Sequence, residues 1–290
     1  MNAKINMSKQ GFRLRPGRIA LGVFGGLILV LIGYSWLFQS ELVYNPSPKL
    51  LCVPSQINMA YEDLALTTED NVKVNAWYFP LTNACGIVLI CRNSSANMSY
   101  DINLIEFIQA LQLEAMIFDY EGFGKSGGRP SEQGTYHDAQ TAWKYLTLHR
   151  GKKPSEVVLW GNGMGGATAA WLAARENPAG LIIQSGYTSL PDLLAGHYKQ
   201  VPHFVVRILC RYKYNTSGFL ASVKCPVLIF HSKDDDNIPF EHGQKLLEAA
   251  HAPKWFIETG GLHGDEIFAS RSVLKSAITN FVAQVGLREY

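Results

Sequence analysis

Residues 157–166 constrain the fold more strongly than any other stretch of this chain. The apolar run Val157–Trp160 is typical of a buried strand, Gly161–Gly166 is rich in glycine, and Ala167–Arg175 has the composition of a helix. A strand that passes through a sharp glycine turn into a helix is the arrangement of a nucleophile elbow, G-x-S-x-G, which projects its central side chain above a sheet. The central residue here is Gly163, so the pattern predicts the turn without its nucleophile.

Short apolar runs alternate with helix-length segments from residue 87 onward, and this alternation predicts the fold class. Runs that are apolar on both faces indicate central parallel strands, whereas the stripes at 139–146 and 274–285 repeat with the period of a helix. The pattern predicts an α/β fold with a mostly parallel, doubly wound sheet and ligands at the carboxyl ends of its strands. Two earlier runs, 61–67 and 72–79, flank a polar turn and predict an N-terminal β-hairpin. The predicted central strands are Ile87–Ile90, Ala115–Phe118, Val157–Trp160, Leu181–Ile183 and Val227–Phe230.

An uncharged apolar segment precedes the predicted sheet. As a helix, residues 19–40 would be about 33 Å long at about 1.5 Å per residue, which is enough to cross a hydrocarbon core. The basic tail at 1–18 places the N-terminus in the cytoplasm and the remainder on the periplasmic, extracellular or lumenal side. We therefore expect a single-pass signal anchor at 19–40, a linker at 41–59 and one domain at 60–290. A cleaved signal peptide is the alternative, although no small-x-small site follows the apolar run.

The charge balance argues against a nucleic-acid partner. Five of the 26 basic residues precede residue 19, so 21 remain against 24 acidic residues, and no basic stripe is visible. The five cysteines show neither a C-x-x-C pair nor metal-ligand spacing, and we interpret them as small buried apolar residues. We expect no metal or cofactor. The pattern Gly161-x-Gly163-x-x-Gly166 matches a dinucleotide fingerprint, but it follows a late strand.

One interval interrupts the strand–helix alternation. Residues 188–223 are too many for a single crossover and are rich in aromatic and basic side chains. Two interpretations are open: a small lid over a ligand pocket, or a helix with a surface loop.

Two further candidate groups follow later predicted strands. The aspartates Asp234–Asp236 come after the strand that ends at Phe230, and the spacing to Ile238–Pro239 favours Asp235. His263 lies in a glycine-flanked loop after the last predicted strand. The order elbow, acid, histidine is that of a hydrolytic triad, in which the carboxylate fixes the histidine tautomer and stabilises its cation.

Together these motifs resemble the α/β-hydrolase superfamily over residues 60–285. Within it the resemblance is to small membrane-anchored serine hydrolases related to serine aminopeptidases and lysophospholipase-like enzymes. Phe118–Ser126 resembles the family's F-D-Y-R-G-x-G-x-S, and His231–Pro239 resembles H-G-x-x-D-x-x-[VI]-P.

The resemblance implies a role for five positions. Asp235 and His263 would be the triad partners of residue Gly163. The backbone N–H of Met164 would be one donor of the oxyanion hole, and the loop that holds Arg92 would supply the second.

The chain departs from the family pattern in its catalytic loops. Gly163 stands where the family has serine, and Cys91–Asn93 stands where it has H-G-N. Arg92 is therefore expected to put a long cationic side chain where backbone must approach a carbonyl oxygen. Glu121 replaces the family's arginine, and Ser232 replaces a glycine.

Three functions are compatible with these residues. Because Gly163 cannot form an acyl-enzyme, the first is a catalytically impaired homologue that binds a small acyl-type ligand or a partner at the membrane. The second is an active ester, amide or thioester hydrolase in which Asp235 and His263 activate water. The third is a purely structural membrane protein whose pocket is filled. Alternative nucleophiles for the second function are Ser94, Ser95 and Ser185.

Overall fold

The computed structural model describes residues 26, 30, 33–34, 36–251 and 253–287. The chain divides into two units, Met1–Gln39 and Ser40–Tyr290, which are described separately. In the first unit the described residues are helical apart from a turn at Phe38. The tail at 1–18 and most of the predicted span at 19–40 lie outside the described residues. Within the part of the chain that the structure describes, no helix has both the length and the apolar character needed to cross a membrane.

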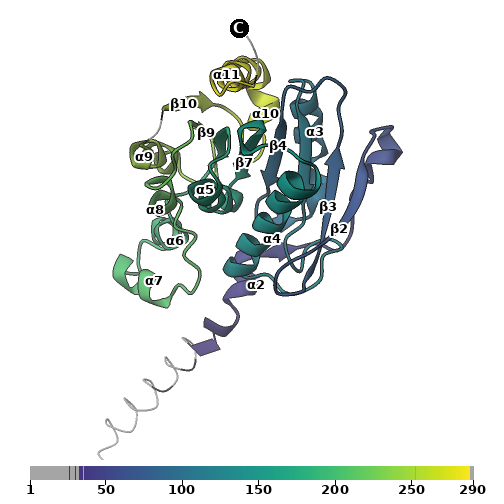
Figure 1. Ribbon diagram of the computed structural model, residues 1–290. Helices are drawn as coiled ribbons and strands as arrows, with labels where there is room; N and C mark the ends of the chain where they lie inside the picture. Colours follow the sequence, from purple (N-terminus) through teal and green to yellow (C-terminus); the bar gives the residue numbers. More distant parts are fainter. Residues whose placement is uncertain (1–25, 27–29, 31–32, 35, 252, 288–290) are drawn as a thin grey trace, which may run out of the picture. The chain divides into compact units, whose positions relative to one another are not determined.

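An eight-stranded sheet forms the centre of the second unit (Figure 1). Its strands are β2 (Glu62–Thr67), β3 (Lys73–Phe79), β4 (Ile87–Cys91), β6 (Glu114–Phe118), β7 (Val157–Asn162), β8 (Gly180–Gln184), β9 (Val227–Ser232) and β10 (Lys254–Thr259). The spatial order is β10-β9-β8-β7-β4-β6-β3-β2. Neighbouring strands from β10 to β6 are parallel, and β3 runs antiparallel to both β6 and β2. The predicted mostly parallel sheet and the N-terminal hairpin are confirmed.

Helices cover both faces of the sheet, because successive side chains of the buried strands point to opposite sides. In β4, Ile87 and Leu89 belong to one apolar core, and Val88 and Ile90 belong to the other. The first core is completed by α4 (Glu132–Lys144), α5 (Met164–Glu176), α8 (Thr216–Leu220) and α9 (Glu241–Ala249). The second is completed by α3 (Ile102–Gln109) and α11 (Arg271–Gln284). Shorter elements are the 3₁₀ turns Pro54–Ile57, Met98–Asp101 and Pro154–Glu156, the π-helical turn Tyr145–His149 and α10 (Glu266–Ala269).

The interval 188–223 contains α6 (Leu190–His197), α7 (His203–Leu209) and α8. The Ser189 side chain caps α6 by accepting a hydrogen bond from the backbone N–H of Asp192. The first residues of the second unit pack against this interval. The buried hydroxyl groups of Tyr44 and Tyr214 are hydrogen-bonded at 2.7 Å. The same segment holds α2 (Gln39–Val43) and β1 (Asn45–Pro46), and β1 pairs in parallel with β5 (Ser95–Ala96). Part of the predicted linker at 41–59 is therefore packed onto the domain.

Candidate functional site

The turn between β7 and α5 has the geometry of an elbow. Gly163 lies between β7 and α5 as the N-cap of the helix, with φ 54° and ψ −114°, a conformation that L side chains rarely adopt. The glycines two residues before and after it, Gly161 and Gly165, permit close backbone packing. A Cβ at Gly161 would lie 2.4 Å from the carbonyl oxygen of Gly165, and a Cβ at Gly165 would lie 2.0 Å from that of Cys91. Glycine at 161 and 165 is therefore required by packing.

Gly163 differs from these two glycines because its surroundings leave room for a Cβ. A Cβ built there would meet His263 Nε2 at 3.6 Å and Asn93 Cβ at 3.7 Å, which are ordinary van der Waals distances. The nearest group is thus the imidazole that a nucleophile at 163 would need. Only backbone strain, and no steric clash, opposes a side chain at this position.

The histidine at the elbow is held by one carboxylate. His263 Nδ1 lies 2.9 Å from Asp235 Oδ2, and the other oxygen, Oδ1, accepts the backbone N–H groups of Asn237 (2.9 Å) and Ile238 (2.7 Å). Because Nδ1 bonds to a carboxylate, it carries the proton and Nε2 presents its lone pair toward Gly163. Of the three candidate aspartates, the structure places Asp235 on the imidazole. Asp236 accepts only the backbone N–H of His263, at 3.3 Å.

The two partners shift each other's pKa in opposite directions. Burial alone would lower the pKa of His263, but the hydrogen bond and charge of Asp235, aided by Glu266 and Asp236, outweigh it and raise the pKa above 6.5. Burial would raise the pKa of Asp235, but hydrogen bonds from His231, His263 and the Ile238 N–H hold it well below its usual range. The charge of Asp235 therefore makes His263 a stronger base than burial alone would allow.

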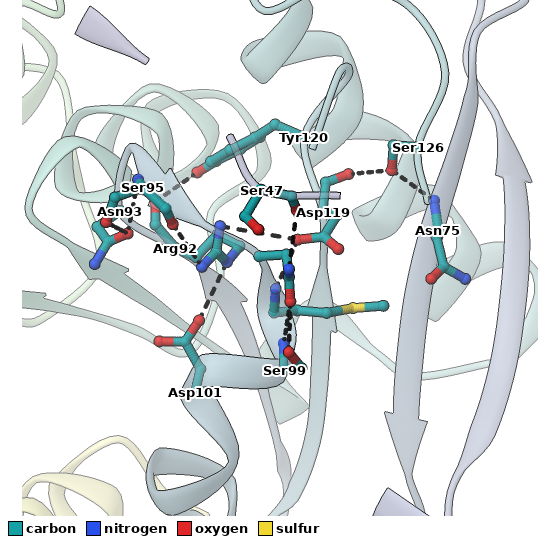
Figure 2. Close-up of polar contacts among 12 residues, drawn as sticks. Ser47, Asn75, Arg92, Asn93, Ser95, Ser99, Asp101, Asp119, Tyr120 and Ser126 are labelled. Carbon is teal, nitrogen blue, oxygen red and sulfur yellow. Dashed lines mark hydrogen bonds and ion pairs between the residues drawn. The ribbon is translucent and has the colours of Figure 1, made fainter. Parts of the chain in front are cut away.

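The loop predicted to complete the oxyanion hole is ordered by Arg92, as Figure 2 shows. The Arg92 side chain is buried, with Nε 3.1 Å from Asp101 Oδ2 and Nη1 3.8 Å from Asp119 Oδ1. Its Nη2 donates to the carbonyl oxygen of Ser95 at 2.9 Å. Tyr120 donates its hydroxyl to the Arg92 carbonyl oxygen at 3.1 Å. The expectation that the Arg92 side chain would intrude on the site is wrong, because the carboxylates of Asp101 and the buried Asp119 draw it away.

A cavity of about 280 Å³ lies beside Gly163 and beneath α6. Most of its lining is apolar, and Met164 contributes to it, whereas Arg92 does not. Such a cavity does not fit a protein whose pocket is filled. The lining residues are Leu42, Val43, Asn93, Ser94, Gly163, Met164, Tyr187, Leu190, Leu193, Leu194, His197, Asn237, Ile238 and His263.

The three alternative serines have different surroundings. Ser94 lines the cavity, and Ser95 donates its hydroxyl to Asn93 Oδ1 at 3.1 Å. Ser185 is fully buried at φ 43° and donates its hydroxyl to Glu266. The structure thus leaves Ser94 as the serine that faces the pocket.

Glu266 is a site residue that sequence reasoning missed. It is fully buried and also accepts a hydrogen bond from Gln184 Nε2 at 2.9 Å. One atom each of Asp235, His263 and Glu266 lies within 4.8 Å of the others, a spacing that a metal ion could use, but hydrogen bonds within the protein already engage all three. No local signal marks Glu266, because it begins the short helix α10 after the histidine loop.

A parallel α/β sheet with an elbow after β7, a carboxylate after β9 and a histidine after β10 defines an α/β-hydrolase fold. The family described as serine aminopeptidase, S33, matches residues 83–218. The uncharacterized protein Rv2307c of Mycobacterium tuberculosis is 32% identical over 274 residues, covering 92% of this chain and 96% of that protein. The chain belongs to the α/β-hydrolase superfamily.

Two further similarities agree with this membership. The uncharacterized membrane protein YNL320W of Saccharomyces cerevisiae is 27% identical over 264 residues, covering 87% of this chain and 92% of that protein. The solved structure of the Pyrococcus furiosus esterase Pf2001 superposes with a TM-score of 0.69 at 21% identity, covering 83% of this chain and all of the esterase chain. That structural likeness supports the fold.

Proposed function

We propose that this chain is a catalytically impaired α/β-hydrolase that binds a small acyl-type ligand or a protein partner instead of hydrolysing an ester. The observation that carries the proposal is Gly163, which holds elbow geometry beneath His263 without a nucleophilic atom. In a serine protease, loss of the serine alone lowers turnover by on the order of 10⁶. A covalent acyl-enzyme cannot form at residue 163.

The pocket supports a ligand with an apolar tail. Leu190, Leu193 and Leu194 of α6 line one side of the cavity, and Leu42 and Val43 line it as well. Apolar walls with a few convergent polar groups are typical of sites for small molecules. The polar groups here would come from His263 and from the backbone N–H of Met164, which would meet the carbonyl end of such a ligand.

A membrane anchor at residues 19–40 is part of the proposal. Its support is the uncharged apolar run, the basic tail at 1–18 and the name of the yeast relative, which describes that relative as a membrane protein. The N-terminus would lie in the cytoplasm and the hydrolase-fold domain on the far side of that membrane. Resistance of the full chain to alkaline carbonate extraction tests the anchor, and release by carbonate would contradict it.

Hydrolysis assays of the unmodified chain test the proposed impairment. The full chain and His263→Ala are compared on esters whose acyl groups range from short to long. We expect neither protein to exceed the uncatalysed rate. Turnover by the unmodified chain that disappears in His263→Ala would overturn the proposal.

The second candidate is a hydrolase that uses water. The geometry that favours it is the lone pair of His263 Nε2 aimed at the open space beside Gly163. There the imidazole would take a proton from water while the oxygen attacks the carbonyl carbon of a bound ester, as general-base catalysis. The C–O bond to the alcohol would then break, and the imidazolium would return its proton to the leaving alkoxide. This mechanism predicts turnover that is lost in both His263→Ala and Asp235→Asn but retained in Ser94→Ala. Loss in Ser94→Ala would assign the nucleophile to that serine instead.

A further inference from the structure

A cluster of exposed apolar side chains lies on α7 and the turn before it. Tyr198, Val201, Phe204 and Ile208 are 59%, 38%, 66% and 74% exposed. Phe204 and Ile208 are four residues apart in the helix and so share one face. Single exposed apolar residues are common, whereas four large ones within eleven positions concentrate apolar surface in one segment, which is typical of interaction sites. We name these four residues the α7 face.

Basic side chains border the α7 face. Lys199 and Lys213 are exposed, and the Arg207 side chain is 62% exposed. The carboxylates near these cations are Asp192, Glu132 and Glu241. Asp192 is shared between His203 at 2.9 Å and Arg207 at 3.4 Å, and Glu132 accepts the backbone N–H of Lys213 at 2.6 Å. Aromatic and aliphatic side chains flanked by cations are the composition of segments that lie in the headgroup region of an anionic membrane.

The α7 face lies at the same end of the domain as residues 40–43, where the chain enters the domain after the predicted anchor. Leu42, which is 79% exposed, lies two residues after Ser40 and lines the same cavity as α6. Asp192 on α6, the helix that lines the cavity, contacts His203 on α7, so the two helices are joined by this side-chain pair. In Figure 1, α2 and α7 lie toward the lower end of the domain and α11 lies at its upper end.

We propose that the α7 face lies in the headgroup region of an anionic bilayer, in the membrane that residues 19–40 enter. This inference rests on the anchor in the proposed function. It also defines the ligand more narrowly. One helix, α6, lies between the α7 face and the cavity, so the cavity would lie close to the leaflet and would take an acyl-chain amphiphile from it. The exposure of Phe204 and Ile208 then follows from contact with lipid.

The test places a polarity-sensitive fluorophore on the α7 face of the full chain in vesicles. Cys52 and Cys85, the partly exposed native thiols, are replaced by serine, and the fluorophore is attached to Ile208→Cys. The matched control is Val273→Cys, which is 52% exposed on α11. Vesicles of phosphatidylcholine with phosphatidylglycerol carry brominated acyl chains that quench a fluorophore in contact with them.

We expect a blue shift and quenching at position 208 and neither at 273. Lys199→Glu should weaken the quenching at 208 in anionic vesicles, and Phe204→Ser should weaken it in any vesicle. Equal quenching at 208 and 273, or quenching at neither, would overturn the proposal.

Carbonate extraction of the same vesicles separates this inference from the anchor. If the chain resists extraction while position 208 stays unquenched, the anchor stands and the α7 contact is wrong. If carbonate releases a chain that had been quenched at 208, the α7 contact stands and the anchor is wrong.

Discussion

The backbone conformation of Gly163 disfavours any side chain, although the space beside this residue would accept a Cβ. Its φ of 54° is the cause of the penalty, whereas His263 and Asn93 stay at least 3.6 Å from a Cβ placed there. An elbow that keeps a serine must sustain this strain for the sake of catalysis. A chain released from catalysis gains stability from glycine at the same position.

The strain at residue 163 predicts a measurable loss of stability. Gly163→Ala should lower the free energy of unfolding by about 1–3 kcal/mol, because alanine is forced into the left-handed region. Gly196→Ala is a matched control, since it adds a methyl group to open space within α6. That control should raise stability by about 0.5–1 kcal/mol. Urea unfolding of both variants checks the pair, and a neutral Gly163→Ala would contradict the strain argument.

The raised pKa of His263 predicts a pH profile for any activity that uses it. His263 accepts a proton only when it is neutral, so the rate should rise with pH through a midpoint above 6.5. Added to Gly163→Ser, Asp235→Asn removes the charge that raises this pKa, so any slow turnover that remains should have a lower midpoint. Initial rates of Gly163→Ser across pH measure the midpoint. A midpoint at or below 6.5 would show that burial outweighs Asp235.

The conformation of the loop that follows β4 is held by ion pairs of Arg92. Arg92 lies between Asp101 and Asp119, while Asn97 holds the entering chain by donating to the carbonyl oxygens of Ser47 (2.9 Å) and Lys49 (2.8 Å). Burial raises the pKa of Asp119 to about 6, although Arg92 opposes the shift. The loop beside the elbow therefore depends on one cation.

Replacing that cation with the family residue should destabilise the fold in a pH-dependent way. Arg92→Gly leaves Asp101 and Asp119 without their cation and should cost about 3–5 kcal/mol at neutral pH. Because the pKa of Asp119 is already raised, the stability that its protonated form confers is present at low pH and is lost as pH rises through about 6. Without Arg92, which lowers this pKa, the Asp119 pKa should lie higher still, so the cost should shrink as pH falls toward about 6. Urea midpoints on both sides of pH 6 check this, with Arg92→Lys as the charge-retaining control; a loss independent of pH would contradict it.

The elements were more predictable than the contacts between them. Apolar runs and glycine turns depend on local sequence, so β4, β6, β7, β8 and β9 appear where they were expected. Asp235 could be chosen from three aspartates because its spacing to Ile238 matters physically: that N–H binds its carboxylate. The direction of Arg92 and the burial of Glu266 depend on partners that only the folded chain brings near.

In the whole molecule, the fold brings together the parts of a hydrolase site, but residue 163 has no hydroxyl that could act as the nucleophile. The sheet carries Gly163, Asp235 and His263 at the carboxyl ends of β7, β9 and β10, and α6 covers the cavity between them. The cavity wall also includes Leu42 and Val43 from the segment that follows the predicted anchor. The proposed role, ligand capture next to a membrane, uses this whole arrangement and requires no acyl-enzyme.

If only the nucleophile is missing from this site, one substitution should restore hydrolysis. The experiment assays full-length Gly163→Ser on short-chain esters beside the unmodified chain and Gly163→Ser/His263→Ala. We expect Gly163→Ser to hydrolyse the esters, whereas the other two proteins should not exceed the uncatalysed rate. A folded Gly163→Ser without turnover would show instead that the loop at Arg92 or the oxyanion hole is also incompetent.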